Sequence, residues 1–291
     1  MCTAITYKTK NTYFGRNLDL EFSYGECVTI TPRNFPLNFR HLPTLNRHYA
    51  IIGMAHIADG YPLYYDAANE KGLAIAGLRF TDSAPYAKNS AGIASFELAP
   101  FLLSSCKTLD DVKNTLSDIN ITDDHFSEKL QNEPLHWMVA DKSSSLVLEW
   151  SENGLNIFEN PSSVLTNNPT FDRQVHTSFP ILPGGLSSKE RYARVRHVLE
   201  KSFSDPSEAA SISQFFHILG SVLQPRGCNI TEDGAEITIY SSCMNLNEGV
   251  YYYTTYENSR ITAVNMHSED LNGTRLITFP LHTAQDIRRV N

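Results

Sequence analysis

The second residue of the chain constrains it most, because Cys2 follows directly after Met1. A side chain as small as that of Cys2 permits an aminopeptidase to remove Met1, so we expect a mature chain that begins with a thiol and a free α-amine on one residue. The ordinary pKa is about 8.5 for a Cys thiol and about 7.7–8.0 for an α-amine. At neutral pH the amine would therefore be the nearest proton acceptor for the thiol. A nucleophile activated by its own α-amine is a known route to covalent catalysis.

The residues after Cys2 predict a β-hairpin. Two runs rich in aromatic and β-branched residues, 3–7 and 12–17, flank a polar stretch at 8–11, which is the pattern of two strands joined by a turn. The alternative interpretation of Cys2 is an unreactive thiol that lies near the start of the chain by chance. The hairpin by itself leaves both interpretations open.

A turn centred on residue 10 would pair Cys2 with Leu18 and Ala4 with Arg16. These four side chains would then share one face of the hairpin. The guanidinium of Arg16 would lie diagonal to the thiol, where a positive charge favours the thiolate, and Asp19 would lie just beyond the strand, within reach of the α-amine. A register shifted by one residue would turn Arg16 to the other face.

Composition restricts the partners of the chain. It has 291 residues, 41% of them hydrophobic, and a net charge of −8. The negative charge argues against nucleic acid and anionic membranes as partners. No apolar run reaches the roughly 18 residues of a membrane span, and no signal peptide is evident, so we expect a cytoplasmic protein. Five scattered cysteines do not indicate a disulfide framework.

The order of predicted elements indicates an α+β protein. Strand-like segments occupy both ends of the chain, and the helical patterns lie mainly between them, at 95–103, 108–119, 187–203 and 212–223. Separate blocks of strands and helices, with short turns between strands, are typical of antiparallel sheets covered by helices. No linker or repeat divides the chain, and we therefore predict a single domain, 1–291.

Two further polar residues are candidates for the same site. Arg191 shares a helical face with Val195 and Val198, and an arginine on a core-facing stripe needs a partner or a function; the alternative is a side chain that extends to solvent at the helix end. Asn167 ends a strand two residues before Pro169, where its amide could stabilise an oxyanion. Ordinary turn chemistry also explains an asparagine at that position.

Other chemistries lack their motifs. The sequence contains no phosphate-binding glycine loop, no G-x-S-x-G elbow and no metalloprotease or C-x-x-C motif. The ten histidines are dispersed without the spacing of metal ligands. We therefore expect neither a metal nor an organic cofactor.

The chain resembles the choloylglycine hydrolase family, which comprises bile salt hydrolases and penicillin V acylases. The resemblance covers essentially the whole chain and depends on many motifs in the same order. These motifs are MCT at 1–3, FGRNLD at 14–19, YPLYYDAANEKGL at 61–73, LHWM at 135–138, LTNNPTF at 165–171, ERY at 190–192 and YYTTYEN at 252–258.

The resemblance implies the fold and the roles of the candidate residues. The family consists of N-terminal nucleophile hydrolases, so the implied fold is a four-layer αββα sandwich of antiparallel sheets. Cys2 is implied to be nucleophile and base, with Arg16 and Asp19 as its direct partners. The resemblance further implies that Asn167 is an oxyanion donor and that Arg191 is a supporting cation.

The chain departs from the family pattern at two places. Arg79 stands where bile salt hydrolases usually have asparagine and penicillin V acylases often have tyrosine. If the backbone N–H of Arg79 is the second oxyanion donor, this substitution preserves catalysis and changes substrate preference. Between Phe171 and Arg191 the chain is also about twenty residues shorter than the family's bile salt hydrolases. The missing segment contributes to tetramers in the family, so the expected homo-oligomer is a tetramer or a dimer.

The resemblance thus predicts a cysteine amidase for glycine- or taurine-conjugated bile salts. An apolar cleft for the amphipathic substrate would include Phe22, Tyr24, Ala55, Ile57, Tyr61, Phe126 and Leu135. Within the same enzyme class, the alternative is an acylase for penicillin V or N-acyl homoserine lactones. Outside it, the alternative is a binding protein for amphipathic acids that lacks catalysis.

Overall fold

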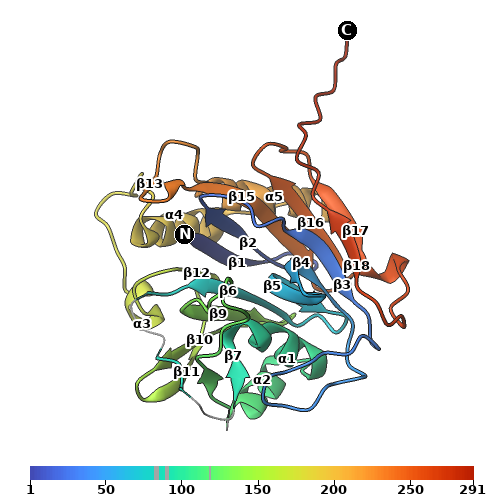
Figure 1. Ribbon diagram of the computed structural model, residues 1–291. Coiled ribbons are helices and arrows are strands. Elements are labelled where there is room, and N and C mark those ends of the chain that lie inside the picture. Colours follow the sequence, from blue (N-terminus) through green and yellow to red (C-terminus); the bar gives the residue numbers. More distant parts are fainter. Residues whose placement is uncertain (82–84, 89–91, 118) are drawn as a thin grey trace.

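Two antiparallel sheets stacked face to face form the centre of the molecule (Figure 1). The computed structural model describes all residues except 82–84, 89–91 and 118. The first sheet has six strands in the order β12-β1-β2-β15-β16-β17, and the second has eight in the order β11-β10-β9-β6-β5-β4-β3-β18. Cys2 lies in the apolar layer between the sheets, to which both contribute alternate side chains.

The strands of the six-stranded sheet come from the two ends and the middle of the chain. They are β1 (Cys2–Lys8), β2 (Thr12–Leu20), β12 (Val164–Thr166), β15 (Ile237–Asn245), β16 (Val250–Thr255) and β17 (Thr262–Asn265). The eight-stranded sheet contains β3 (Cys27–Thr31), β4 (Ile51–Ala58), β5 (Tyr61–Asn69), β6 (Ala74–Arg79), β9 (Leu135–Ala140), β10 (Ser145–Ser151), β11 (Gly154–Glu159) and β18 (Ile277–Pro280). Short pairs form at β7 (Ile93–Ala94) with β8 (Ile121–Thr122) and at β13 (Ile230–Thr231) with β14 (Gly234–Ala235).

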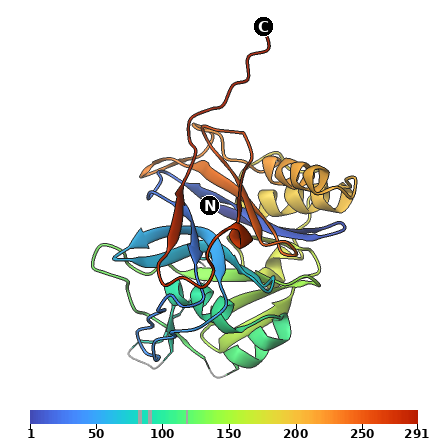
Figure 2. The same cartoon turned by 90° about the vertical axis from the view of Figure 1, so that its right-hand side faces the viewer.

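Helices cover the outer face of each sheet (Figure 2). Helices α4 (Ser188–Lys201) and α5 (Glu208–Gly220) pack on the six-stranded sheet, and α1 (Leu98–Ser105) and α2 (Leu109–Leu116) pack on the eight-stranded sheet. The short helix α3 (Phe171–Gln174) follows β12, and single 3-10 turns occur at Ser95–Glu97 and Met266–Ser268. The predicted α+β αββα sandwich is therefore confirmed. No helix in the described ranges is long and apolar enough to cross a membrane.

The predicted hairpin register is also confirmed. Strands β1 and β2 pair Cys2 with Leu18 and Ala4 with Arg16. All four side chains are buried on the face toward the second sheet. Asp19 follows on the opposite face of β2, because successive side chains alternate along a strand.

Helices α2, α4 and α5 each begin directly after a residue whose side chain caps the helix. The predicted segment 212–223 is α5, which begins four residues earlier, at Glu208, because the Ser207 side chain accepts a hydrogen bond from the Ala210 N–H. The helix ends at Gly220, before the predicted end. Helix α4 follows Ser187, whose side chain and that of Glu190 form a capping box.

Close packing of β2 on β15 leaves no space for a side chain at Gly15. A Cβ at this position would collide with the backbone carbonyl of Ser242. We expect Gly15→Ala to lower the free energy of unfolding by about 1–3 kcal/mol, which urea denaturation would measure. Gly220→Ala is the matched control, because its Cβ would meet open space, and it should be neutral or stabilising by up to about 1 kcal/mol. Equal losses in the two variants would contradict this account.

Candidate active site

Three residues distant in sequence meet at the first residue of β1. The backbone N–H of Cys2 donates a hydrogen bond to Oδ1 of Asn167 at 2.7 Å. Arg191 donates from Nη2 to the carbonyl oxygen of Cys2 at 2.9 Å and to the same Oδ1 of Asn167 at 2.7 Å. The predicted grouping of Cys2, Asn167 and Arg191 thus has direct contacts, and all three residues are buried.

Arg191 faces the sheet from the first turn of α4, so its side chain does not extend to solvent. It is fully buried, and its Nε also donates to Oγ1 of Thr3 at 3.3 Å. Burial lowers its pKa, and electrostatic interactions with Asp19 and Cys2 oppose this effect. Arg191 therefore fixes the backbone of β1 and the amide of Asn167 at the same time.

Met1 occupies the end of the site next to Cys2. Its ammonium donates to the carbonyl oxygen of Asp19 at 2.8 Å and forms an ion pair with Glu236, while the Asp19 N–H donates to the Met1 carbonyl at 2.9 Å. Burial lowers the pKa of this ammonium. While Met1 is attached, the nitrogen of Cys2 is an amide and has no basic lone pair. The predicted base would exist only after Met1 is removed.

Asp19 lies on the helix side of β2 and is fully buried. Its Oδ1 accepts a hydrogen bond from the Thr238 hydroxyl at 2.6 Å, and its Oδ2 has no hydrogen-bond partner within the described part of the chain. Burial raises the pKa of Asp19, against the opposing charges of the Met1 ammonium and Arg191. The carboxyl group thus interacts electrostatically with both cations of the site. Its role in orienting an amine stays a prediction.

Arg16 extends from β2 into the layer between the sheets and reaches the second sheet. Its Nη1 donates to the carbonyl oxygens of Tyr65 at 3.1 Å and Gly77 at 2.6 Å. Its Nη2 is buried and has no partner among the described residues. Burial lowers the pKa of Arg16, but electrostatic interactions with Cys2, Tyr240, Asp66 and Asp19 outweigh burial, and the pKa is raised. Arg16 therefore remains charged and has one guanidinium nitrogen free to contact a reacting group.

Asp66 is a functional candidate that the sequence-based reasoning missed. This fully buried carboxylate on β5 accepts hydrogen bonds from the hydroxyls of Tyr240, Tyr251 and Ser242. Burial raises its pKa, against the opposing charge of Arg16 and the three hydroxyl donors. The sequence does contain a signal for this residue, because Asp66 is the one charged side chain in the strand-like run 61–69. A charge in a buried strand needs a partner or a function.

Asn167 connects the site to the end of β6. Its Nδ2 donates to the carbonyl oxygen of Arg79 at 2.8 Å, so the two predicted oxyanion residues are adjacent. Gln174, which the sequence-based reasoning also missed, is fully buried and donates from Nε2 to the carbonyl of Pro169 at 2.7 Å. This contact fixes the turn that presents Asn167. The Arg79 side chain points outward and forms an exposed ion pair with Glu133 at 3.2 Å.

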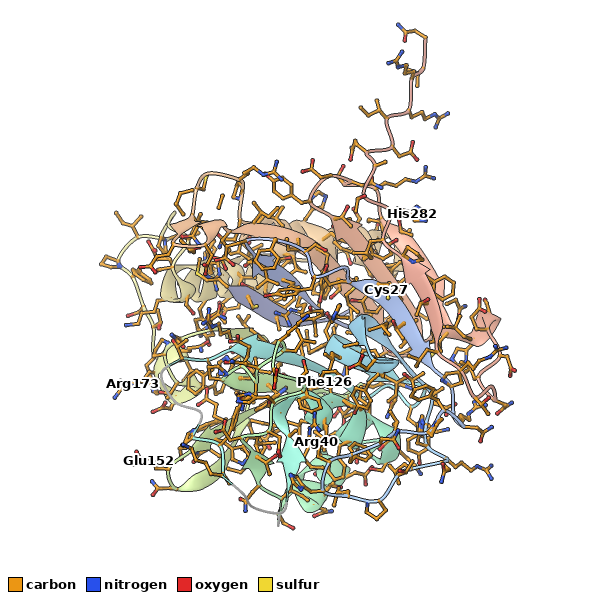
Figure 3. All side chains as sticks on the ribbon, viewed as in Figure 1. Cys27, Arg40, Phe126, Glu152, Arg173 and His282 are labelled. Carbon is orange, nitrogen blue, oxygen red and sulfur yellow. The ribbon has the colours of Figure 1, made fainter. Side chains whose placement is uncertain are left out.

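The residues predicted to bind substrate form two aromatic groups. Phe22 and Tyr24 are exposed, with ring centroids 4.8 Å apart, and Tyr24 lies 6.4 Å from His56. Tyr61 lies 6.0 Å from Phe126, whose carbonyl accepts a hydrogen bond from Nη2 of Arg40 at 2.6 Å (Figure 3).

The other predicted contacts are less accessible. Ile57 and Leu135 are half-buried, whereas Ala55 has no exposed surface in the middle of β4. Direct contact between Ala55 and a ligand would therefore require a change in this strand. Within the described ranges, no cluster of His, Cys, Asp and Glu side chains is arranged to bind a metal ion.

Comparisons with known proteins agree with this geometry. Residues 2–180 and 177–279 match the model of the family described as linear amide C-N hydrolases, choloylglycine hydrolase family. The chain belongs to the choloylglycine hydrolase family. It is therefore a hydrolase that acts on linear carbon–nitrogen amide bonds, as predicted.

Several members of this family are similar over their full length. The chain is 46% identical to a bile salt hydrolase/transferase of Lactiplantibacillus plantarum and 34% identical to one of Clostridium perfringens, and each comparison covers 100% of both chains. The crystal structure of the C2A mutant of conjugated bile acid hydrolase from Clostridium perfringens matches with a TM-score of 0.91 at 33% identity, over 100% of both chains. Penicillin V acylase from Agrobacterium tumefaciens has the same fold, with a TM-score of 0.80 at 18% identity over 95% of this chain and 90% of its own.

The raised pKa of Asp19 predicts how stability depends on pH. Between the ordinary carboxyl pKa and the raised value, the folded state binds more protons than the unfolded state, so this group lowers the free energy of unfolding as pH rises. We expect Asp19→Asn to make the slope of that free energy against pH less negative, measured by urea denaturation between about pH 4 and pH 7.

Asp111 provides a control with the opposite sign. Hydrogen bonds from the backbone N–H groups of Lys107 and Thr108 lower its pKa, so its stabilisation is lost as pH falls toward the lowered value. Asp111→Asn should therefore make the slope less positive below about pH 4, outside the range in which Asp19 acts. A slope unaffected by Asp19→Asn would contradict the raised pKa.

Proposed function

We propose that this family member hydrolyses the amide bond of glycine- or taurine-conjugated bile salts through a thioester on Cys2. The observation that carries the proposal is the contact of Cys2 with both Asn167 and Arg191, next to the buried charge of Arg16. Two relatives named as bile salt hydrolase/transferases, similar to this chain over their full length, support the choice of substrate.

The reaction begins once Met1 has been removed. The Cys2 thiol passes its proton to its own α-amine, and the sulfur attacks the amide carbonyl carbon. The carbonyl oxygen becomes an oxyanion, which is stabilised by the second N–H of the Asn167 Nδ2 group and by the backbone N–H of Arg79. The carbon–nitrogen bond then breaks, and the ammonium of Cys2 returns the proton to the leaving amine of glycine or taurine.

Water completes the cycle. The α-amine of Cys2 accepts a proton from a water molecule as the water oxygen attacks the thioester carbonyl. The same donors stabilise the second oxyanion. The carbon–sulfur bond breaks, the bile acid leaves, and the proton returns to the thiol. Throughout, Arg191 holds the Cys2 carbonyl and Oδ1 of Asn167 in place, while Arg16 supplies a fixed positive charge near the sulfur.

The substrate would lie against two groups of aromatic side chains, one exposed and one half-buried. Phe22 and Tyr24 offer an apolar surface for a steroid, and Tyr61 with Phe126 forms a second one. The ion pair between Arg79 and Glu133 is exposed next to the Asn167 turn. Either aromatic group could also receive the phenoxyacetyl group of penicillin V or a fatty acyl chain, and these remain the alternative substrates.

We further propose that the enzyme acts in the cytoplasm as a homo-oligomer, either a dimer or a tetramer. Five free cysteines suit a reducing compartment. The segment that follows α3 exposes Phe179, Ile181 and Leu182, which are 39%, 83% and 46% accessible. Exposed apolar side chains that lie this close together in sequence support contact with a second subunit.

The proposed nucleophile predicts a specific chemical signature. The intact mass should lack Met1, and the protein should release glycine from glycocholate and taurine from taurocholate faster than it cleaves penicillin V. Cys2→Ala should retain its thermal unfolding temperature and lose detectable hydrolysis, because no other group can form the thioester. The matched control is Cys228→Ala, which removes an exposed thiol and should retain activity.

Two results would overturn this proposal. Retained Met1 together with no hydrolysis of any of these substrates would favour a non-catalytic binding protein for amphipathic acids. Preferential cleavage of penicillin V or an N-acyl homoserine lactone would assign the same chemistry to an acylase.

The two oxyanion donors should respond differently to truncation. Asn167→Ala removes the donor atom itself, so kcat should fall by about 10²–10³-fold. Arg79→Ala retains the backbone N–H and removes only the exposed guanidinium. Its kcat should fall by less than about tenfold, with the larger change in KM. Steady-state kinetics with glycocholate would measure both variants, and a loss in Arg79→Ala as large as that in Asn167→Ala would contradict a backbone role.

A further inference from the structure

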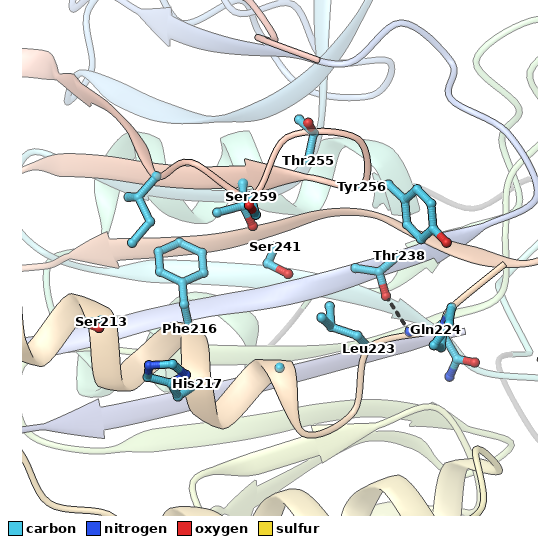
Figure 4. A pocket seen from close by; sticks show the side chains of 14 residues that line it. Ser213, Phe216, His217, Leu223, Gln224, Thr238, Ser241, Thr255, Tyr256 and Ser259 are labelled. Carbon is cyan, nitrogen blue, oxygen red and sulfur yellow. Dashed lines mark hydrogen bonds between the residues drawn. The ribbon is translucent and has the colours of Figure 1, made fainter. Parts of the chain in front are cut away.

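A second pocket lies on the outer face of the six-stranded sheet, beside α5 (Figure 4). Its volume is about 510 Å³, within the range of about 300–1,000 Å³ for small-molecule sites. It is lined by α5, by the chain that follows this helix, and by parts of β15, β16 and the loop after β16. The thiol of Cys2 belongs to the layer between the sheets, so this pocket is separate from the proposed active site.

The walls of the pocket have two chemical characters. One part is apolar and includes large side chains that a soluble protein usually buries, namely Leu223, Tyr256 and Ile261, which are 41%, 37% and 39% accessible. The other part contains hydroxyl residues. Three of them, Thr238, Ser241 and Thr255, are buried and already donate hydrogen bonds within the protein. The hydroxyl residues are Ser213, Thr238, Ser241, Thr254, Thr255 and Ser259. No Asp, Glu, Lys or Arg is among the described residues that line the pocket.

Gln224 gives an independent indication of a ligand. It lines the pocket and is fully buried, yet neither its amide oxygen nor its amide nitrogen has a hydrogen-bond partner in the described part of the chain. An unpaired buried amide group costs about 1–3 kcal/mol. These amide atoms have no exposed surface, so a bound molecule with hydroxyl groups would satisfy them once the Gln224 amide turned toward the cavity.

A cation lies at the rim. The guanidinium carbon of Arg226 is 5.0 Å from the centre of the Tyr256 ring, and Arg226 also pairs with the exposed carboxylate of Glu257 at 2.9 Å. Because this ion pair is exposed, an incoming carboxylate could compete for the arginine at little cost. The apolar side chains, the hydroxyl residues and Arg226 together suit a rigid ligand that has one apolar face, one hydroxylated face and an acidic tail.

We infer that this pocket is a second, non-catalytic binding site for the hydroxylated steroid body of a bile acid. The inference rests on the proposed function for the choice of ligand, and its chemistry comes from the pocket itself. The apolar side chains would receive the hydrocarbon face, the hydroxyl residues and Gln224 would receive the hydroxylated face, and Arg226 would receive the acid.

The site has a direct connection to the proposed active site. The Thr238 hydroxyl accepts a hydrogen bond from the backbone N–H of Gln224 at 2.9 Å and donates one to Oδ1 of Asp19 at 2.6 Å. Ser241 donates to Oδ1 of Asn17, also on β2, at 2.7 Å. A ligand that shifts Gln224 or β15 therefore changes the hydrogen bonding of Asp19, and occupancy of the pocket modulates hydrolysis.

Filling the pocket by mutation tests the site. The residue at the end of α5, Gly220, lines the pocket, and a Cβ there would meet open space, so Gly220→Phe should occupy the cavity. Equilibrium dialysis with radiolabelled cholate should show that this variant binds one molecule per chain fewer than the wild type. Ala209→Phe adds the same ring to an exposed position of α5 outside the pocket and should bind cholate as the wild type does. Ser213→Trp is a second pocket-filling variant in case Gly220→Phe does not fold.

The possible results separate this inference from the proposed function. If the wild type binds one cholate and Gly220→Phe binds none, the pocket is a cholate site even when the protein hydrolyses nothing. Equal cholate binding by the wild type and both folded pocket variants would overturn the site. A change of oligomeric state in Gly220→Phe, seen by sedimentation, would assign the surface to self-association and also overturn it.

Kinetics test the connection to Asp19. The rate of glycocholate hydrolysis by the wild type and by Ala209→Phe should deviate from a hyperbolic dependence on substrate concentration, with at least about a fivefold change in apparent KM as the second site fills. Gly220→Phe should follow a hyperbola. Hyperbolic kinetics in all three proteins would overturn the coupling.

Discussion

The buried charge of Arg16 is the interaction on which the rest of the structure depends. A guanidinium between two apolar sheet faces is tolerated only when its surroundings compensate the charge. Here the compensation comes from carbonyl oxygens of two strands of the opposite sheet and from the Asp66 carboxylate with its hydroxyl donors. The contacts of Arg16 therefore fix three features together: the separation of the sheets, the register of β2 and the position of the thiol. The site cannot change independently of the core.

The sequence predicted those parts of the site that depend on local periodicity. The register of the first hairpin followed from where its turn lies, and the inward direction of Arg191 followed from the helical stripe that it shares with Val195. Both predictions concerned neighbours within about sixteen residues of one another, for which strand and helix periods are reliable. The αββα arrangement came from the family resemblance, because the order of elements indicated only the α+β class.

Two of the missed residues have partners that are far away in sequence: Glu236 pairs with the ammonium of Met1, and Thr238 pairs with Asp19. Gln174 was missed although its partner, the turn at Pro169, lies only five residues away. Periodicity shows which face of an element is buried, but it does not show which side chain of another element lies opposite. A buried carboxylate such as Asp66 can be recognised as unusual from the sequence, whereas its three hydroxyl partners can be assigned only when the strands are placed.

Strand β2 separates two chemical environments that are only one backbone apart. Arg16 and Leu18 point into the layer between the sheets, whereas Asn17 and Asp19 point toward the helices. The site thus uses both faces of the same strand. A change in the hydrogen bonds of Asn17 or Asp19 can therefore move the β2 backbone, and with it the side chain of Arg16. No long series of intervening contacts is needed.

The burial of the Met1 ammonium bears on the proposed removal of Met1. In the folded chain this group is already bound by the Asp19 carbonyl and by Glu236, and Arg191 contacts the methionine side chain. An aminopeptidase needs the same ammonium free and the first peptide bond extended in its own cleft. If Met1 is removed, as we propose, its removal and the closure of the hairpin therefore compete for the same ammonium group.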